Sequence, residues 1–168
     1  MCSSDLDWGG MVVWDMALRH PDRVAGVIGV NTPFLPRGPV DPIAAMRAAY
    51  GDDMYVVWFQ QPGLADAVLG TDVERSIRFF MRKPLLTLEQ YQQLPAEMRT
   101  LALGEALKLY DAATDTQQFL TDDEIAAFAE SFAATGFTGG INWYRNFTRN
   151  WEASAGRKGH VGVPSLMI

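Results

Sequence analysis

The chain has 168 residues, enough for one domain with a sizeable core, and its content of 48% hydrophobic and 20% charged residues is ordinary for a globular protein. Its 14 basic against 20 acidic residues give a net charge of -6, which argues against nucleic acid as a partner, because phosphate binding needs clustered Lys and Arg. No apolar run approaches the roughly 18 residues of a membrane span. The single Cys2 excludes an internal disulfide, so a cytoplasmic enzyme is the default expectation.

The N-terminal region predicts half of a βαβ unit. Residues 9–20 are apolar on nearly every side, which is typical of a helix buried on several faces. Pro21-Asp22 ends this helix. Residues 24–30 are apolar without alternation, as in a strand buried on both faces of a parallel sheet. A helix that leads directly into such a strand is half of a βαβ unit.

The middle of the chain predicts helices and no buried strand. Residues 31–42 are rich in proline and form a connection that leaves the sheet. Asp41, followed by Pro42, has the pattern of a helix N-cap, and Thr121 to Glu124 have the spacing of a capping box. Asp52 or Asp53 is expected to cap a further helix. The expected helices cover residues 41–49, 52–60, 71–82, 87–99, 121–134 and 141–151.

The C-terminal residues predict a return to sheet. Residues 156–159 form a linker, and the apolar residues 161–168 predict another buried strand. The chain therefore reads as sheet, helical insertion, sheet, with divisions at residues 1–34, 35–155 and 156–168.

The sharpest local signal is Asp7-Trp8-Gly9-Gly10 at the start of the first helix. A nucleophile on a tight strand-to-helix turn needs tiny residues two and three places on, because the helix backbone passes close by. The helix N-terminus also favours a carboxylate that is ionised and ready to attack. The alternative from these residues is that Asp7 is only a helix cap, followed by a flexible glycine pair.

Two groups of motifs resemble one enzyme family. Asp7-Trp8-Gly9-Gly10-Met11-Val12, His20-Pro21-Asp22-Arg23-Val24 and Asn31-Thr32-Pro33-Phe34 resemble the nucleophile elbow, the following helix and the next strand of α/β-hydrolase epoxide hydrolases. Haloalkane dehalogenases share much of this stretch. Phe59-Gln60-Gln61-Pro62-Gly63 and Asn142-Trp143-Tyr144-Arg145-Asn146 resemble cap segments of the epoxide hydrolases specifically. The resemblance covers about residues 7–168 and is weak over residues 83–120.

The resemblance implies an α/β fold in which a large helical cap, residues 35–155, is inserted into a partial α/β-hydrolase core of parallel strands and a nucleophile helix. It implies that Asp7 is the nucleophile and that the backbone N–H of Trp8 is an oxyanion-hole donor. Tyr144 and Tyr55 match the two cap tyrosines that hydrogen-bond the epoxide oxygen. The chemistry needs such donors, because an alkoxide leaving group is strongly basic.

The aromatic residues also have structural interpretations. A tyrosine beside a tryptophan on a helix usually packs in a core or interface, with its hydroxyl bonded to a local partner. Trp58, Phe59 and Trp143 are candidates to line an apolar substrate pocket, and buried packing explains them as well. Tyr91 and Tyr110 lie in no motif and are interpreted as structural.

Other expected parts of the enzyme are missing from the sequence. Hydrolysis of the ester needs a His, oriented by an acid, and only His20 and His160 are present. His20 is interpreted as a helix C-cap residue, and His160 precedes the expected acid in chain order. The upstream His-Gly-x-Pro segment is absent, and the polar Met1 to Leu6 predict no buried strand before Asp7. We therefore expect Met1 to Leu6 to be non-native, the sequence to be truncated at both ends and the fragment to be inactive.

The expected parent function is conversion of a small apolar epoxide to a vicinal diol through a covalent aspartyl ester. No metal or organic cofactor is implied. A haloalkane dehalogenase is the alternative enzyme, against which Tyr144 in its motif discriminates. A non-catalytic helical interaction module is the alternative of another class. The oligomeric state cannot be read from the sequence.

Overall fold

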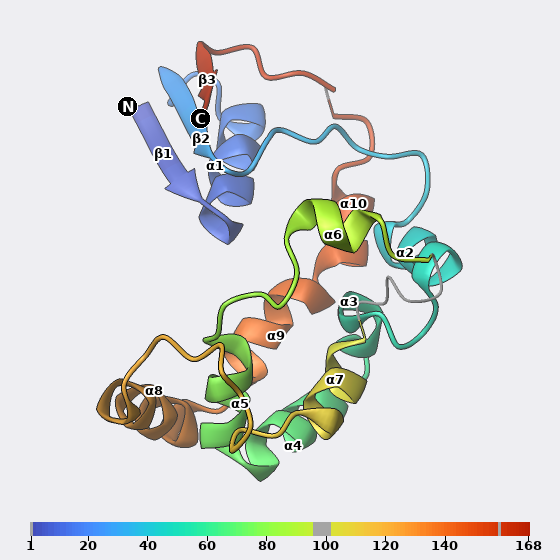
Figure 1. Ribbon diagram of the computed structural model, residues 1–168. Helices are drawn as coiled ribbons and strands as arrows, with labels where there is room; N and C mark the ends of the chain where they lie inside the picture. The colour runs from blue at the N-terminus through green and yellow to red at the C-terminus, as the bar shows by residue number, and fades with distance from the viewer. Residues whose placement is uncertain (1, 96–101, 158) are drawn as a thin grey trace. The chain divides into compact units, whose positions relative to one another are not determined.

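The computed structural model describes residues 2–95, 102–157 and 159–168. The chain forms two compact units (Figure 1). The first unit holds residues 1–39 and 150–168, and the second holds residues 40–149. The sequence predicted the boundaries between residues 34 and 35 and between residues 155 and 156, about five residues from those observed. Among the described residues, no helix is long and apolar enough to cross a membrane.

The first unit is a three-stranded parallel sheet with a helix against one face (Figure 1). Its strands, in the order β1-β2-β3, are Cys2–Leu6, Gly26–Val30 and Ser165–Met167, and helix α1 covers Trp8–Arg19. This α/β arrangement with an inserted helical region confirms the expected fold class. The core is apolar and formed by α1, β2 and the segment between them: Val13, Trp14, Ala17, Val24 and Val27.

Three expectations for this unit are wrong. A strand precedes Asp7, because β1 pairs along its whole length with β2, and backbone hydrogen bonds do not require apolar side chains. Helix α1 is buried on one face rather than several, since Met11 and Val12 are each 40% exposed. The last strand is only three residues long, and all three are exposed rather than buried.

The second unit contains helices α2 to α9. Their bounds are Pro42–Tyr50 (α2), Tyr55–Trp58 (α3), Leu64–Thr71 (α4), Val73–Phe80 (α5), Leu88–Gln92 (α6), Leu103–Leu109 (α7), Asp122–Thr135 (α8) and Thr138–Arg145 (α9). Helix α10, Phe147–Ala153, contains the point where the chain passes back into the first unit. Two predicted caps are confirmed: Asp41 accepts a hydrogen bond from the Ile43 N–H, and Thr121 and Glu124 form a capping box.

Other helix predictions need correction. Helix α3 begins after Met54, whose sulfur accepts from the Val56 N–H, so neither Asp52 nor Asp53 is its cap. The expected helix over residues 71–82 is shorter, because Asp72 has an extended backbone and caps α5. Helices α4 and α7 were not predicted. The expected helix over 141–151 is interrupted at Asn146, and that over 87–99 runs in part beyond the described residues.

Candidate active site

Asp7 lies in a strained turn between β1 and α1. Its φ is 52° and its ψ is -122°, a conformation that costs a non-glycine residue of order 1–3 kcal/mol and that the surrounding structure must enforce. The Asp7 side chain forms no capping hydrogen bond with α1, and the residue is exposed. The carboxylate therefore does not serve as a conventional helix cap, and it is accessible to a reactant.

Thr32 and Gly10 fit closely together beneath this turn. The Thr32 hydroxyl donates to the Asp7 carbonyl oxygen over 3.2 Å. A Cβ atom added at Gly10 would lie 2.6 Å from the Thr32 Cβ, so only glycine allows this approach of α1 to the segment after β2. The close approach requires glycine at the third position after Asp7.

Asp7 and Asn31 occupy equivalent places in the sheet. Leu6 and Val30 are paired across β1 and β2, so the next residue of each strand lies at the same carboxyl edge. Both Asp7 and Asn31 have a φ of 52°. The carboxyl ends of parallel strands are the edge at which open α/β sheets bind ligands.

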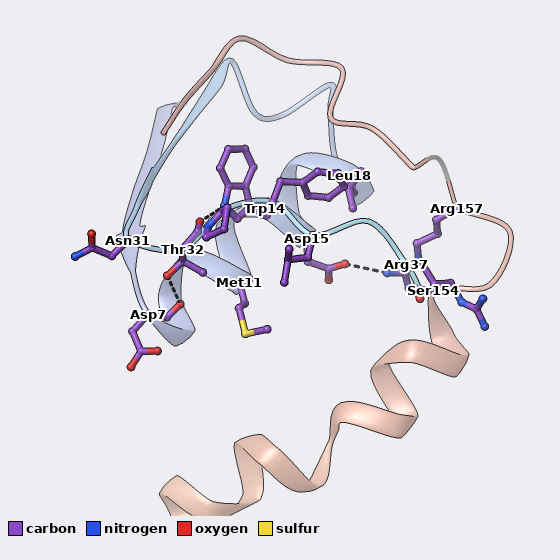
Figure 2. Close-up of a pocket in the computed structure, with 13 residues that line it drawn as sticks. Asp7, Met11, Trp14, Asp15, Leu18, Asn31, Thr32, Arg37, Ser154 and Arg157 are labelled. Carbon is purple, nitrogen blue, oxygen red and sulfur yellow. Dashed lines mark hydrogen bonds and ion pairs between the residues drawn. The ribbon is translucent and has the colours of Figure 1, made fainter. Parts of the chain in front are cut away.

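A pocket of about 370 Å³ opens within the first unit beside this edge (Figure 2). Asp7 and Asn31 lie at one end of it, and Ser154 and Arg157 at the other. The Arg157 guanidinium lies 2.9 Å from the Asp15 carboxylate. The remaining wall is largely apolar and comes from α1 and the segment after β2: Met11, Trp14, Leu18, Pro33, Phe34 and Leu35.

Trp8 is the first residue of α1. The N–H groups in the first turn of a helix point out of its N-terminal end, where the helix dipole favours negative charge. The backbone N–H of Trp8 therefore has the position in sequence and secondary structure that an oxyanion donor next to Asp7 requires.

Tyr55 and Tyr144 lie on different helices, α3 and α9, and their rings are in contact. The ring centroids are 5.7 Å apart and the planes meet at 80°, an edge-to-face pair. Phe59 packs against both rings, at 5.7 Å from Tyr55 and 5.0 Å from Tyr144. Both tyrosines are half-buried and contact two core clusters of the second unit.

The three aromatic residues expected to line a pocket have different surroundings. Phe59 is buried, with 6% of its surface exposed, and Trp58 is half-buried with its ring 5.4 Å from that of Phe59. Trp143 is 48% exposed although it precedes Tyr144 in sequence. Phe59 thus supports the tyrosine pair from inside the core, while Trp143 lies at the surface of its unit.

Sequence reasoning assigned no role to Thr32, Gln60 or Arg145. All three lie inside the motifs that carried the resemblance, and their place in those motifs was the available signal. The structure gives each one hydrogen bonds to backbone carbonyls near Asp7 or Tyr144.

Neither of the two histidines lines the pocket beside Asp7. His20 is the C-cap residue of α1, where its backbone N–H donates to the Met16 carbonyl oxygen, as predicted. His160 is exposed and precedes β3. Within residues 2–95, 102–157 and 159–168, no group of three or more His, Cys, Asp or Glu side chains is arranged to hold a metal ion.

Asp7 lies in a strained turn between a parallel strand and a helix, and Gly10 is required there by close packing. Residues 6–168 match the alpha/beta hydrolase fold family, and the chain belongs to this family. The chain is 40% identical over 166 residues to Epoxide hydrolase A of Mycobacterium tuberculosis, covering 96% of this chain and 50% of that protein. It is 38% identical to Epoxide hydrolase 1 of Siraitia grosvenorii, covering 96% of this chain and 49% of that protein.

The solved structures that are similar to the chain are also epoxide hydrolases. The chain is similar to Epoxide Hydrolase A from Mycobacterium thermoresistibile, with a TM-score of 0.73, 36% identity and coverage of 98% of this chain and 51% of that one. An epoxide hydrolase from Vigna radiata has a TM-score of 0.68 and 32% identity, with coverage of 98% and 47%. The expected resemblance to epoxide hydrolases is confirmed, and neither alternative is favoured. The chain spans about half the length of these relatives.

Proposed function

We propose that the protein containing this chain opens a small apolar epoxide to a vicinal diol through an ester on Asp7. The observation that carries the proposal is the contact between Tyr55 and Tyr144, two phenols from separate helices, in a chain that also presents an exposed aspartate in a strained turn. Similarity to proteins named epoxide hydrolases supports it. Two neighbouring phenols can both donate hydrogen bonds to the epoxide oxygen, which must be protonated as its C–O bond breaks.

In the first step, an Asp7 carboxylate oxygen forms a bond to an epoxide carbon. The ring C–O bond breaks, its electron pair goes to the epoxide oxygen, and that oxygen takes a proton from Tyr55 or Tyr144. In the second step, water attacks the carbonyl carbon of the ester, and the Trp8 N–H stabilises the oxyanion that forms there. The bond between the carbonyl carbon and the diol oxygen breaks, and the diol oxygen takes one proton of the water. The other proton returns to the tyrosinate, so that the phenol and the Asp7 carboxylate are both regenerated.

The proposal also names the residues that contact the substrate. Trp58, Phe59 and Trp143 are proposed as apolar contacts for the substituents of the epoxide. The substrate class follows from the reaction: an uncharged ring whose carbon is attacked and whose oxygen is protonated. We propose the cytoplasm as the compartment, because residues 7–168 contain no cysteine and so give no sign of an oxidising compartment.

The test is a search for the covalent intermediate. The product of the complete reading frame that contains residues 1–168 is mixed with an aryl epoxide, quenched in acid and measured by intact mass spectrometry. We expect a mass increase of one epoxide, mapped by peptide sequencing to Asp7. Asp7→Asn should give no adduct, while Asp22→Asn, which alters another exposed carboxylate near α1, should react like the wild type. An adduct that persists in Asp7→Asn would overturn the assignment.

A further inference from the structure

The two cap motifs are joined directly by the side chain of Gln60. Its amide nitrogen donates to the carbonyl oxygen of Val56 over 2.8 Å, within its own segment. The same nitrogen donates to the carbonyl oxygen of Tyr144 over 3.1 Å. Gln60 thus connects the helix that carries Tyr55 to the backbone of Tyr144 itself.

Arg145, on α9, also connects the two cap motifs, here by donating to the segment that follows α3. Its Nε donates to the Phe59 carbonyl oxygen over 2.8 Å, and its Nη2 donates to the Gln61 carbonyl oxygen over 3.2 Å. Nη2 also lies 2.8 Å from a carboxylate oxygen of Asp66, at the start of α4. Nη1 donates to the Asn142 side-chain oxygen over 3.0 Å. The planar guanidinium has several donors in a fixed arrangement, so one side chain holds four acceptors in a defined geometry.

The Arg145–Asp66 pair is shielded from solvent. The side chains are only 17% and 18% exposed. Asp66 also accepts a hydrogen bond from the Thr138 hydroxyl at the other end of α9. The hydrogen bond from Thr138, together with Arg145, holds the pKa of Asp66 below its ordinary value, so the carboxylate stays ionised as the partner of Arg145.

Helix α3 depends on these contacts because it is very short. It covers four residues, Tyr55–Trp58, and a helix of one turn is not stable by itself in water. The carbonyl groups of Tyr55, Val57 and Trp58 accept from the backbone N–H groups of the three residues that follow α3. Arg145 binds the chain just beyond the helix, where it donates to the carbonyl oxygens of Phe59 and Gln61. These bonds therefore link the end of α3, the helix that carries Tyr55, to α9, the helix that carries Tyr144.

We propose that Arg145 and Gln60 are positioning residues that hold Tyr55 and Tyr144 at a fixed separation for proton donation to one epoxide oxygen. The inference rests on the proposed function of the tyrosine pair. Neither residue touches the reacting atoms in this scheme. Each acts through the backbone of the segment that carries a donor, and a misplacement of about 1 Å is enough to slow a reaction of this kind about 100-fold.

Arg75 provides a matched control within the same unit. Its guanidinium donates to the carbonyl oxygens of Leu107, over 2.7 Å, and Tyr110, over 2.6 Å, at the end of α7. Arg75 therefore anchors the end of a helix with the same chemistry as Arg145, but it acts on α7 rather than on the segments that carry Tyr55 and Tyr144. A loss of general stability affects both variants, whereas only Arg145→Gln removes hydrogen bonds made directly to the segments that carry the tyrosines.

The experiment measures ester formation on Asp7 in single turnovers, with the product of the complete reading frame and an aryl epoxide. We expect Arg145→Gln to lower the maximal rate of ester formation about 10- to 100-fold while the half-saturating epoxide concentration changes less than about twofold. Arg75→Gln should change the maximal rate less than about twofold at an equal fraction of folded protein. Gln60→Leu should slow the reaction in the same way as Arg145→Gln, by a smaller factor.

Two results would overturn the inference. One is a wild-type maximal rate in folded Arg145→Gln, and the other is an equal loss of rate in Arg75→Gln. If Arg145→Gln does not fold, Gln60→Leu decides: an unchanged maximal rate in that variant rejects the positioning role. Failure of the proposed function is seen separately, because the wild-type protein itself then forms no ester on Asp7.

Discussion

Gly10 and Thr32 are so close that a Cβ atom on Gly10 would lie 2.6 Å from the Cβ of Thr32. The contact joins the first turn of α1 to the segment that follows β2. Thr32 also donates to the carbonyl oxygen of Asp7, so the same residue packs under the helix and holds the strained turn. The geometry of Asp7 is therefore coupled to the volume available at position 10.

Gly10→Ala should destabilise the first unit by about 1–3 kcal/mol, because a buried methyl group must displace Thr32. Hydrogen exchange of the α1 and β2 amides measures this loss. Gly139→Ala, at a helical position with nothing within 4 Å of the added Cβ, is the control and should be neutral or slightly stabilising. Thr32→Gly should restore part of the loss in the double variant, and equal exchange in Gly10→Ala and wild type would contradict the packing argument.

The two tyrosines are predicted to share one role. Tyr144→Phe should slow ester formation on Asp7 about 100-fold or more, the size of effect expected on losing a general acid, unless Tyr55 compensates. The double variant Tyr55→Phe, Tyr144→Phe should form no measurable ester. Tyr91→Phe is the control, since Tyr91 lies outside both cap motifs. Rapid quenching followed by mass spectrometry gives the rates, and unchanged alkylation in the double variant would remove the tyrosines from the mechanism.

Asp66 is predicted to make stability dependent on pH in the acid range. Its pKa in the folded protein is lowered from 3.8, chiefly by the Thr138 hydroxyl and further by Arg145. A lowered folded pKa means that the stabilisation is fully present above the unfolded value and is lost as pH falls through the folded value. Asp66→Asn should cost about 1.5–3 kcal/mol near neutral pH, the worth of a hydrogen bond to a charged group.

Urea titrations between neutral and acid pH test this expectation. The difference in free energy of unfolding between wild type and Asp66→Asn should be constant above about pH 5 and should shrink as Asp66 becomes protonated. Asp52→Asn is the control, because the Arg47–Asp52 pair is 50% and 78% exposed and such pairs contribute little. A difference that stays constant down to the acid transition would argue against the role of the ionised carboxylate.

Local features were the most predictable part of the structure. The caps at Asp41 and Thr121 were predicted because a cap depends on a few consecutive residues. The strand Cys2–Leu6 was missed, because its polar sequence gives no sign of a strand and its conformation comes from pairing with β2. Helix α3 was predicted with the wrong length for a similar reason: contacts distant in sequence determine where it ends.

The candidate site also has a part that local sequence predicts and a part that depends on contacts distant in sequence. Asp7 could be proposed from sequence because the turn requires glycines at fixed spacing, and Tyr144 because its motif is compact. The bond from Gln60 to Tyr144 links residues far apart in the sequence, and no periodicity or spacing predicts a pairing of that kind. Even the exposure of Trp143 beside half-buried Tyr144 depends on how α9 packs, not on the motif that contains both.

The segments by which the chain leaves and re-enters the first unit are held together by Arg37 and Trp151. The Arg37 guanidinium carbon lies 4.0 Å from the centre of the Trp151 ring, a cation–π contact. Its Nε donates to the Trp151 carbonyl oxygen over 3.1 Å, and the Trp151 indole N–H donates to the Gly38 carbonyl oxygen over 2.9 Å. The chain leaves the unit after Pro39 and returns at Asn150, so these contacts join its exit and its return.

Trp151→Leu should loosen this junction, because it removes both the cation–π contact and the indole hydrogen bond. Each is worth about 0.5–1.5 kcal/mol, and together they correspond to roughly tenfold faster local opening. Hydrogen exchange should accelerate by about that factor at the amides of Ser154 and Ala155, which are hydrogen-bonded at the end of α10, while the β2 amides remain unchanged. Trp143→Leu, which removes an exposed tryptophan from the second unit, should leave exchange at Ser154 as in wild type. Unchanged exchange at Ser154 and Ala155 in Trp151→Leu would mean that the junction is held by other contacts.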